Sequence, residues 1–593
     1  MKFQETTGEQ FFTPYSIGDF SISADEKRLL FSSNMNGKVN IYGMDLPNYY
    51  PYQFSGMDES TSFIQSAPNG DYVLAGFDKD GDENHKIYAV PPEGGMPEQL
   101  IDAEDKDKFM FTKLSKDGFR VYYTSSKGND SYLNSYIYDI ETKEETLLHE
   151  GEGGPTHLVD VSQDEENSVY VTAYANTYMI GFIKTEAGIE YLTPDIDKIH
   201  TVGSITFVKD DETWFVTNYD SDYSYLAKYD LTTKSFEKVL DFEQESLMMI
   251  KFNRYTNMMY LLTQKGVVEN LYYYDLNHDQ LEPITAPVTS FSGVVTARSG
   301  ALYIKGTSST VPTNIFKYEN ESWEQITKNK VLGVTPEDMV EPEVITYQSF
   351  DDLGIEALLF RAKPENANGY TILWPHGGPQ YNESKSFRAM FQIFLNRGYN
   401  IFCPNFRGST GYGAEFVKMV EGDWGHGPRL DNVEGIKWLF EEGISSPEKL
   451  FLVGGSYGGY MALLLHGRHP EYFKAVVDIF GVSDLFTFYN SVPEHWKPLM
   501  KRWVGNPVED KERFEKDSPV TYLDTMTKPM LVIQGAHDPR VVKEESDQIV
   551  EKLRNAGREV EYIVLDDEGH GFSKKENEIL VYKSMLEFLN EHQ

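Results

Sequence analysis

Residues 449–460 read KLFLVGGSYGGY, and this stretch decides the architecture of the C-terminal half of the chain. A strand pattern over 449–453 leads into a glycine-rich turn, and a helical pattern begins at Tyr457. The pentapeptide G-x-S-x-G is common by chance, but between a strand and a helix it places its serine on a sharp, exposed turn. The stretch therefore predicts that Ser456 is a catalytic nucleophile.

From about residue 340 onward, apolar strand patterns alternate with helical ones. The strand patterns lie at 370–374, 400–403, 449–453, 475–479, 530–533 and 561–565. This alternation predicts a mostly parallel sheet covered by helices on both faces. We therefore expect a doubly wound α/β-hydrolase domain over residues 344–593.

A nucleophilic serine needs a base and an orienting acid, which in this fold follow it in the order Asp, His. Asp538 comes just after strand 530–533, and His570 just after strand 561–565. Both therefore lie at the sheet edge where Ser456 emerges, and we predict a Ser456–His570–Asp538 triad. The remaining titratable residues of these two loops are interpreted as solvated: His537, Asp566, Asp567 and Glu568.

Acyl transfer also requires hydrogen-bond donors for the oxyanion. One expected donor is the backbone N–H of Tyr457, the residue after the nucleophile. The other is placed at Gly378, in the segment His376-Gly377-Gly378-Pro379 after the first strand. Glycines permit close backbone approach there. His376 is interpreted as a brace for this loop, because His570 is better placed as the base.

Residues 20 to about 325 carry an internal repeat. Its turns begin at residues 23, 67, 115, 162, 208, 253 and 297, which are 44–48 residues apart. The strands between them are rich in β-branched and aromatic residues. A period near 45 with about four strands per unit is typical of propeller blades. Seven turns predict a seven-bladed β-propeller over residues 20–327, and the even spacing disfavours a β-sandwich array.

Two further segments complete the predicted organisation. Residues 328–343 contain Pro336 and Pro342, show no periodicity and are predicted to be a linker. Residues 1–19 form an N-terminal extension that includes Phe11 and Phe12. We expect this apolar pair to dock on the hydrolase domain or to reach a second subunit, which makes a homodimer the default prediction.

Composition excludes several classes of function. The 593 residues include 54 basic and 93 acidic ones, a net charge of −39, which repels nucleic acids and anionic membranes. Residues 1–340 contribute 27 basic and 54 acidic residues. The single cysteine, Cys403, excludes an intramolecular disulfide and cysteine-based metal sites. We expect no cofactor and no metal. The start lacks a secretory pattern, and no run of about 20 apolar residues occurs, so a cytoplasmic location is expected.

The motifs in combination resemble the prolyl oligopeptidase family of serine peptidases, most closely its acylaminoacyl-peptidase branch. They are His-Gly-Gly-Pro (376–379), Asn-Phe-Arg-Gly-Ser-Thr-Gly-Tyr-Gly (405–413), Gly-Gly-Ser-Tyr-Gly-Gly (454–459), His-Asp-Pro-Arg-Val (537–541) and Glu-Gly-His-Gly-Phe (568–572). The resemblance covers nearly the whole chain. It implies the triad and the two oxyanion donors given above, short peptides as substrates, and a propeller over the active face. It also implies that Arg540 contacts a substrate carbonyl, although an ion pair within the domain explains this arginine equally well.

The resemblance predicts release of N-acylated residues, and several alternatives stay open. An apolar specificity pocket is expected around Val541 and in segment 480–503, at Phe480, Phe486, Phe488, Tyr489, Trp496 and Trp503, about half of which should be ordinary core. Dipeptidyl peptidases of the wider family hold a free amine with paired glutamates. Here Glu144-Glu145 and Glu165-Glu166 fall in repeat turns and are interpreted as solvated. Oligopeptidase, dipeptidyl-type and carboxylesterase activities remain alternatives, as does a propeller interaction module with a vestigial hydrolase. An acid-lined propeller channel would favour neutral or basic peptides.

Overall fold

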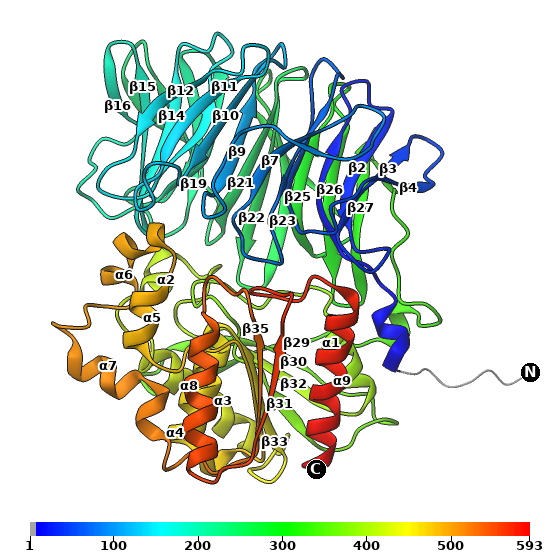
Figure 1. The fold of residues 1–593 in the computed structure, drawn as a ribbon, viewed down its shortest axis with the longest axis vertical. Helices are drawn as coiled ribbons and strands as arrows, with labels where there is room; N and C mark the ends of the chain where they lie inside the picture. Colours follow the sequence, from blue (N-terminus) through cyan, green and yellow to red (C-terminus); the bar gives the residue numbers. More distant parts are fainter. Residues whose placement is uncertain (1–7) are drawn as a thin grey trace, which may run out of the picture.

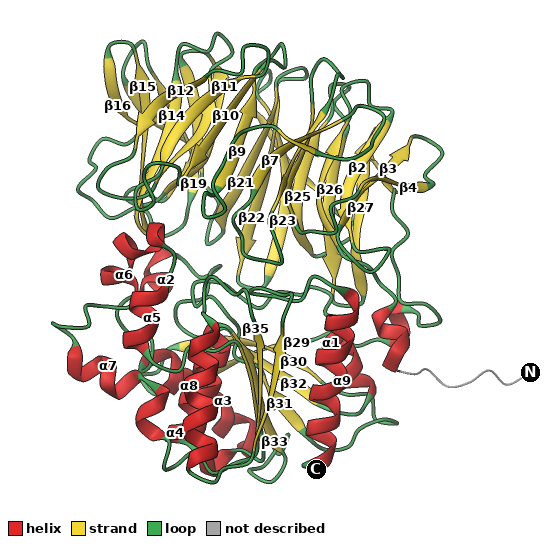
Figure 2. Ribbon diagram, viewed as in Figure 1, coloured by secondary structure: helices red, strands yellow, loops and turns green. Residues whose placement is uncertain are grey.

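The computed structural model describes residues 8–593 as two domains stacked along the long axis of the molecule (Figure 1). The N-terminal domain consists of strands, and the C-terminal domain is a sheet flanked by helices (Figure 2). The predicted fold class is confirmed: a seven-bladed propeller precedes an α/β domain with a mostly parallel sheet.

Each propeller blade is a four-stranded antiparallel sheet built from one contiguous segment of the chain. In chain order the strands are β1 (Ile17–Ile22), β2 (Arg28–Ser33), β3 (Asn40–Asp45), β4 (Pro51–Ser55); β5 (Thr61–Ser66), β6 (Val73–Phe77), β7 (Lys86–Val90), β8 (Glu98–Gln99); β9 (Phe109–Leu114), β10 (Arg120–Ser125), β11 (Asn134–Asp139), β12 (Glu145–Glu150); β13 (Thr156–Val161), β14 (Ser168–Ala175), β15 (Tyr178–Thr185), β16 (Gly188–Tyr191); β17 (Val202–Lys209), β18 (Glu212–Thr217), β19 (Tyr225–Asp230), β20 (Ser235–Leu240); β21 (Ser246–Asn253), β22 (Met258–Lys265), β23 (Val268–Asp275), β24 (Gln280–Ile284); and β25 (Ser290–Thr296), β26 (Leu302–Ser308), β27 (Val311–Glu319), β28 (Ser322–Gln325).

The blade hairpins define which face of the propeller meets the α/β domain. The turns between the second and third strands point toward that domain: the N–H of Lys575 donates to Gly37 O (3.0 Å), and the N–H of Gly266 donates to Gly411 O (2.7 Å). The turns that mark the sequence repeat therefore lie on the opposite face. Because blade 1 and blade 7 share no strand, side chains close the ring, for example Lys305 Nζ donating to Gly18 O (2.7 Å).

The α/β domain contains one eight-stranded sheet in the order β29-β30-β32-β31-β33-β34-β35-β36, parallel from β32 onward. Its strands are β29 (Glu343–Gln348), β30 (Gly354–Phe360), β31 (Thr371–Leu373), β32 (Asn400–Pro404), β33 (Leu450–Gly455), β34 (Val476–Ile479), β35 (Met530–Gly535) and β36 (Val560–Leu565). Its helices are α1 (Ala389–Asn396), α2 (Ala414–Lys418), α3 (Gly427–Glu441), α4 (Tyr457–Arg468), α5 (Leu485–Ser491), α6 (Lys497–Trp503), α7 (Lys511–Asp517), α8 (Lys543–Asn555) and α9 (Lys575–Glu591).

The core of the α/β domain lies on both faces of the sheet. On β33, Leu450 and Leu452 pack toward α3, α4 and α8, whereas Phe451 and Val453 pack toward α1 and α9. All four side chains are fully buried. A strand buried on both faces reads as the continuous apolar run seen in the sequence. This packing fixes β33 and therefore the turn that carries residue 456.

The N-terminal segment docks on its own chain. Phe11 and Phe12 belong to the short helix η1 (Gly8–Phe12), which lies beside α1 and α9 in Figure 1. Both rings are buried against Val331, Ile393 and Tyr582. Of the two expectations for the N-terminal extension, residues 8–12 therefore follow the first and dock on the α/β domain. The part of the extension over residues 1–7 lies outside the described residues. The homodimer stays a prediction.

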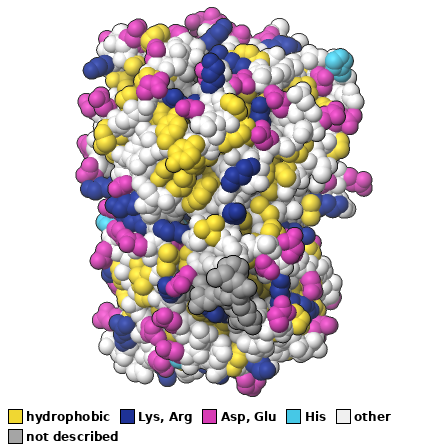
Figure 3. Space-filling view, turned by 90° about the vertical axis from the view of Figure 1, so that its right-hand side faces the viewer, with side chains coloured by type: hydrophobic (Ala, Val, Ile, Leu, Met, Phe, Trp, Pro, Cys, Tyr) yellow, Lys and Arg dark blue, Asp and Glu magenta, His cyan; other side chains and the backbone are white. Residues whose placement is uncertain are grey.

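On one face of the molecule, surface charge is dispersed rather than gathered in one patch (Figure 3). On the face shown in Figure 3, acidic and basic side chains are interspersed over both domains. None of the helices within residues 8–593 combines the length and apolarity needed to cross a membrane.

Candidate active site

Ser456 forms the turn between β33 and α4 in a conformation that few residues adopt. Its φ of +59° and ψ of −122° lie outside the regions favoured by L-residues, at a cost on the order of 1–3 kcal/mol. The flanking glycines make this turn possible. A Cβ on Gly454 would overlap the carbonyl oxygen of Gly458, and a Cβ on Gly458 would overlap that of Pro375. Gly454 and Gly458 are thus required by the close approach of backbones.

The structure brings Ser456, His570 and Asp538 into hydrogen-bond contact. Ser456 Oγ lies 2.9 Å from His570 Nε2, and His570 Nδ1 lies 2.6 Å from Asp538 Oδ2. The three residues come from loops at the carboxyl ends of β33, β36 and β35. The Asp538 carboxylate is buried, and its other oxygen accepts the N–H groups of Arg540 (2.9 Å) and Val541 (3.0 Å). These bonds orient the carboxylate so that it fixes the tautomer of the imidazole.

Two supporting residues of this triad were not found by sequence reasoning or were given another role. Gln534 is fully buried; its Nε2 donates to Val541 O (3.1 Å), and its Oε1 accepts from Ser546 (2.7 Å), which ties the Asp538 loop to α8. The Phe480 ring packs on the His570 imidazole, with 4.5 Å between ring centroids. Nothing in the local sequence distinguishes Gln534 from an ordinary residue at the end of a strand.

The two expected oxyanion donors lie near the nucleophile. Gly378, Ser456 and Tyr457 line the same cavity. A Cβ on Gly377 would stand 3.5 Å from the Ser456 Cβ, so the two loops are in van der Waals contact. Tyr457 is the first residue of α4, and its hydroxyl donates to Trp424 O (2.6 Å), which anchors the start of the helix.

Beside Ser456 opens a small cavity of about 100 Å³ with aromatic walls. Of the predicted pocket residues it is lined by Phe488, Trp496, Trp503, Val541 and Arg540, to which the structure adds Val482 and Trp424.

Phe480 and Phe486 are not part of this cavity, in contrast to the sequence-based expectation. Phe480 faces His570, and Phe486 packs on Phe514 at 5.2 Å. Trp424 was missed because it follows α2, far from the other pocket residues in the sequence. Its ring contacts those of Tyr457 and Trp503 at 5.1 and 4.9 Å.

A propeller loop reaches the catalytic loops. This loop joins β6 to β7 and comprises residues 78–85; Glu83 Oε1 lies 2.7 Å from Arg540 Nε, and Asp80 Oδ1 lies 3.1 Å from Lys574 Nζ. A Cβ on Gly569, next to His570, would overlap Gly81 O. Arg540 thus lines the cavity and also forms an ion pair, across the domain boundary rather than within its own domain.

Several acidic residues that were interpreted as solvated have structural roles. Glu568 is buried, and its carboxylate accepts the N–H groups of Ser573 (3.0 Å) and Lys574 (2.9 Å), which shapes the loop around His570. His537 and Asp566 are exposed, as expected.

Of the glutamate pairs of the propeller, Glu144, Glu145 and Glu166 are exposed, as expected, and Glu165 is half-buried. Glu145 pairs with Lys127 (2.8 Å), and Glu165 pairs with Arg120 (2.9 Å). Both lie by turns on the face remote from Ser456, so neither pair can hold a substrate amine there. Within residues 8–593, no group of three or more His, Cys, Asp or Glu side chains is arranged to hold a metal ion.

The structure thus combines a hydrogen-bonded Ser-His-Asp arrangement with a propeller that contacts the same side of the α/β domain. Residues 385–593, which lie within the α/β domain, match the model of the prolyl oligopeptidase family.

Sequence similarity to individual proteins covers part of the chain. Dipeptidyl aminopeptidase BIII of Pseudoxanthomonas mexicana is 39% identical over 35% of this chain and 31% of its own length. Acylamino-acid-releasing enzyme 1 of Oryza sativa subsp. japonica is 24% identical over 40% of this chain and 31% of its own length. This chain thus spans about a third of the length of each relative. A puromycin-hydrolyzing peptidase of Mycobacterium tuberculosis has the same fold, with a TM-score of 0.86 over 99% of this chain and 96% of its own, at 15% identity.

Proposed function

We propose that this protein is a serine peptidase that cleaves short peptides through an acyl-enzyme. One observation carries the proposal: the hydrogen-bonded Ser456, His570 and Asp538 stand at the mouth of an aromatic cavity whose wall includes Gly378 and Tyr457. Nucleophile, base, orienting acid and oxyanion donors are then all within reach of one scissile carbonyl.

The geometry supports an acyl-transfer mechanism. Ser456 Oγ attacks the carbonyl carbon while His570 Nε2 takes its proton, and Asp538 stabilises the resulting imidazolium. The oxyanion accepts hydrogen bonds from the backbone N–H groups of Gly378 and Tyr457. His570 then protonates the leaving amine, and a water molecule activated by the same base hydrolyses the acyl-enzyme.

The cavity supports an apolar residue on the acyl side of the scissile bond. Its walls are aromatic and aliphatic, and Arg540 at its rim is its one charged residue. The Nε of Arg540 donates to Glu83, and the two terminal nitrogens of the guanidinium are the donors left for a substrate carbonyl. Burial of an apolar side chain against such walls contributes about 1.5–3 kcal/mol to binding.

Contacts between the domains support a restriction to short peptides. Blades 1, 2, 4, 5, 6 and 7 each form hydrogen bonds to the α/β domain around the site. A folded protein cannot pass such a ring without separation of the domains.

The channel itself does not carry the acidic lining that composition suggested. The innermost strands of the seven blades contain two acids, Asp19 and Asp160, and three lysines, at 113, 209 and 251. The acidity of this half lies elsewhere on the propeller, so the channel strands give no basis for exclusion of acidic peptides.

The N-terminal specificity has two candidates, each with its own support. Release of an N-acylated residue is supported by the resemblance of the motifs to the acylaminoacyl-peptidase branch. Release of a unit with a free amine is supported by Glu83: its Oε1 is paired with Arg540, but its Oε2 lies 3.9 Å from Lys108 Nζ, beyond hydrogen-bond distance, and can accept a hydrogen bond from an ammonium group. The relative named dipeptidyl aminopeptidase also shares the higher identity. We favour the free amine, with a carboxylesterase as the remaining alternative.

Two measurements test this proposal. A fluorophosphonate probe should label the wild-type protein and not Ser456→Ala. Initial rates on Ala-Phe-p-nitroanilide, its N-acetyl form, N-acetyl-Phe-p-nitroanilide and p-nitrophenyl butyrate then separate dipeptidyl, acyl and esterase activities. Glu83→Gln should lower kcat/KM about tenfold on the free-amine substrate only, since the charge attraction is lost. Hydrolysis of the ester alone would refute a peptidase, and equal losses on free and acetylated peptides would remove Glu83 from amine binding.

A further inference from the structure

His376 lies two residues before the expected oxyanion donor Gly378, yet the mechanism above does not use its side chain. It precedes Gly377 and Gly378, and its ring is buried and stacks on Phe406 with centroids 4.2 Å apart. Burial lowers the pKa of His376 to about 4, so the ring is neutral near pH 7. A neutral imidazole carries one proton, and its position is decided by its two partners.

The first partner is the carbonyl of Gly377. His376 Nδ1 lies 2.7 Å from Gly377 O, and because a carbonyl only accepts, Nδ1 must donate. In a planar trans peptide the C=O and the following N–H point in opposite directions. A hydrogen bond that draws Gly377 O toward His376 therefore turns the N–H of Gly378 away from this ring. Two glycines alone could not hold that orientation, because they rotate freely.

The second partner is the buried hydroxyl of Ser409. His376 Nε2 lies 2.8 Å from Ser409 Oγ, which also lies 2.6 Å from Phe406 O. The hydroxyl has one proton for these two acceptors, and Phe406 O also accepts the N–H of Ser409 (3.0 Å), so the hydroxyl proton is able to turn to Nε2. Ser409 thus accommodates the Nδ1–H tautomer, and it is Gly377 O that requires this tautomer.

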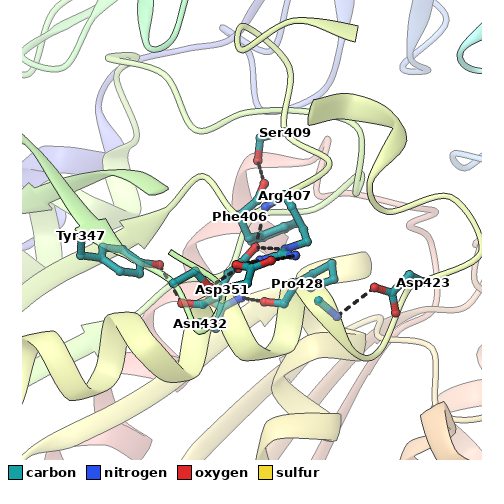
Figure 4. Close-up of polar contacts among 11 residues, drawn as sticks. Tyr347, Asp351, Phe406, Arg407, Ser409, Asp423, Pro428 and Asn432 are labelled. Atoms are coloured by element: carbon teal, nitrogen blue, oxygen red, sulfur yellow. Dashed lines mark hydrogen bonds and ion pairs between the residues drawn. The ribbon is translucent and has the colours of Figure 1, made fainter. Parts of the chain in front are cut away.

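The segment that carries Phe406 and Ser409 is itself anchored through Arg407. Arg407 makes hydrogen bonds of 2.8–3.1 Å to Asp431 of α3 and of 2.9–3.0 Å to Asp351. Figure 4 shows this arrangement, with Ser409 above the Arg407 network. The anchor holds both the ring on which His376 stacks and the hydroxyl that it binds.

We propose that His376 is a positioning residue of the oxyanion hole, and that it acts through the Gly377–Gly378 peptide in the Nδ1–H tautomer that Gly377 O requires. This rests on the serine-hydrolase part of the proposed function and not on its peptide specificity, because esters and amides pass through the same oxyanion. Loss of the Nδ1 donor should therefore lower kcat and leave ground-state binding unchanged.

Two substitutions separate the ring nitrogens. The amide of asparagine reaches the place of Nδ1, whereas that of glutamine reaches the place of Nε2. His376→Gln should lower kcat for p-nitrophenyl butyrate by about 10²–10³, the effect of a lost oxyanion donor, whereas His376→Asn should stay within about tenfold of wild type. KM should change less than twofold. The inhibition constant of a peptide aldehyde, whose adduct places an oxygen in the hole, should weaken in step with kcat, and that of the product acid should not.

Equal losses in the two variants, or equal weakening of aldehyde and product, would overturn the proposal. If the His376 variants do not fold, Ser409→Ala decides: it should lower kcat about three- to tenfold, whereas Thr371→Val should not. Thr371 is a buried hydroxyl at the far end of β31, which makes it a matched control. Equal kcat values in these two variants would refute the role of Ser409.

If the wild-type protein is inactive, the proposed function is refuted, but the position of His376 can still be tested. The tautomer of His376 can be measured without a substrate. ¹⁵N NMR of labelled histidine side chains should show the Nδ1–H tautomer for His376, identified by the signal missing in His376→Asn or, failing that variant, shifted in Ser409→Ala. The Nε2–H tautomer would contradict the proposal.

Discussion

The two loops that flank Ser456 are supported in different ways. The oxyanion loop, residues 376–383, is hydrogen-bonded to residues 405–410 of its own domain: His376 contacts Ser409 (2.8 Å), and the N–H of Thr410 donates to Tyr381 O (3.0 Å). The histidine loop, residues 566–574, contacts the propeller through the ion pair between Lys574 and Asp80. The propeller also contacts the oxyanion loop, at Gln380 and Asn382, beyond the donor Gly378. The difference teaches that the propeller contacts the loop of the base next to His570 itself, whereas the part of the oxyanion loop around His376 is held by residues of the α/β domain.

This comparison has a consequence for motion between the domains. Separation of blade 2 from the α/β domain would break the contacts of Asp80 and Gly81 with the histidine loop. The hydrogen bonds of the oxyanion loop to residues 405–410 would persist. We therefore expect domain opening to disturb the position of His570 before that of Gly378.

The largest expected effect comes from replacement of Ser456, which the oxyanion loop and the histidine loop flank. Ser456→Ala should lower kcat on the order of 10⁴–10⁶-fold, since no other nucleophile stands beside His570. Both loops should keep their structure, so the melting temperature should change by no more than a few degrees. Steady-state kinetics and thermal melting measure the two quantities. Retention of more than a few per cent of activity would refute the assignment.

The next largest effect is expected from the Arg407 network that supports the oxyanion loop. Asp431→Asn removes a buried charge that Arg407 binds with its backbone and its guanidinium, and should cost about 3 kcal/mol of stability. Chemical denaturation measures this loss. Glu343→Gln is the control: its pair with Arg361 is half exposed and should be worth at most about 1 kcal/mol. Similar losses in both variants would show that the Arg407 network is not a special anchor.

A third prediction concerns pH and the propeller loop on the base side. Burial raises the pKa of Asp78 to about 7, and one of its carboxylate oxygens has no hydrogen-bond partner. The folded protein keeps this proton up to about pH 7, while the unfolded chain loses it near 3.8. The stability that the proton contributes is thus complete below pH 3.8 and is lost as the pH rises through 7, by at most about 1.4 kcal/mol per unit.

Asp78→Asn stays uncharged and should remove this dependence. At pH 8 the variant should be more stable than the wild type by roughly 1–3 kcal/mol, while at pH 4 the two should agree. Melting temperatures across pH 4–8 provide the comparison. A wild-type curve parallel to that of the variant would show that Asp78 titrates normally.

The smallest effect tests the propeller contact directly. Asp80→Asn weakens the pair with Lys574 and should lower kcat up to about tenfold, because the histidine loop loses one support. Glu319→Gln removes a similar lysine partner, that of Lys317, on the remote face of the propeller and should leave kcat unchanged. If Asp80→Asn also leaves kcat unchanged, the base is held by its own domain alone, and the contrast between the two loops fails.

Much of the site follows from sequence because its signals are local. The elbow at Ser456 and the loops of Asp538 and His570 each adjoin a strand pattern, and parallel strands end at one edge of a sheet. The seven blades follow from spacing, since each blade is one contiguous segment. Such patterns extend over at most about 50 residues, so they can be recognised without the contacts between distant parts of the chain.

What the sequence could not decide is which side chains face the cavity. Phe486 and Phe488 are two residues apart on α5, so a helix of 3.6 residues per turn directs them to different sides. Phe488 lines the cavity, and Phe486 packs on Phe514. Apolar content alone predicts both equally well, and only the packing of α5 against its neighbours selects one.

The sequence by itself determined the architecture and the grouping of Ser456, His570 and Asp538 at one edge of the sheet, because strand periodicity and glycine spacing are local properties. Only the tertiary structure decided that Arg540 meets Glu83, 457 positions away, and that Trp424 closes the cavity. It also decided that His376 points one ring nitrogen at Gly377 O and the other at Ser409. These contacts depend on how two domains and several loops pack together, and side-chain packing over such separations leaves no periodic signal in the chain.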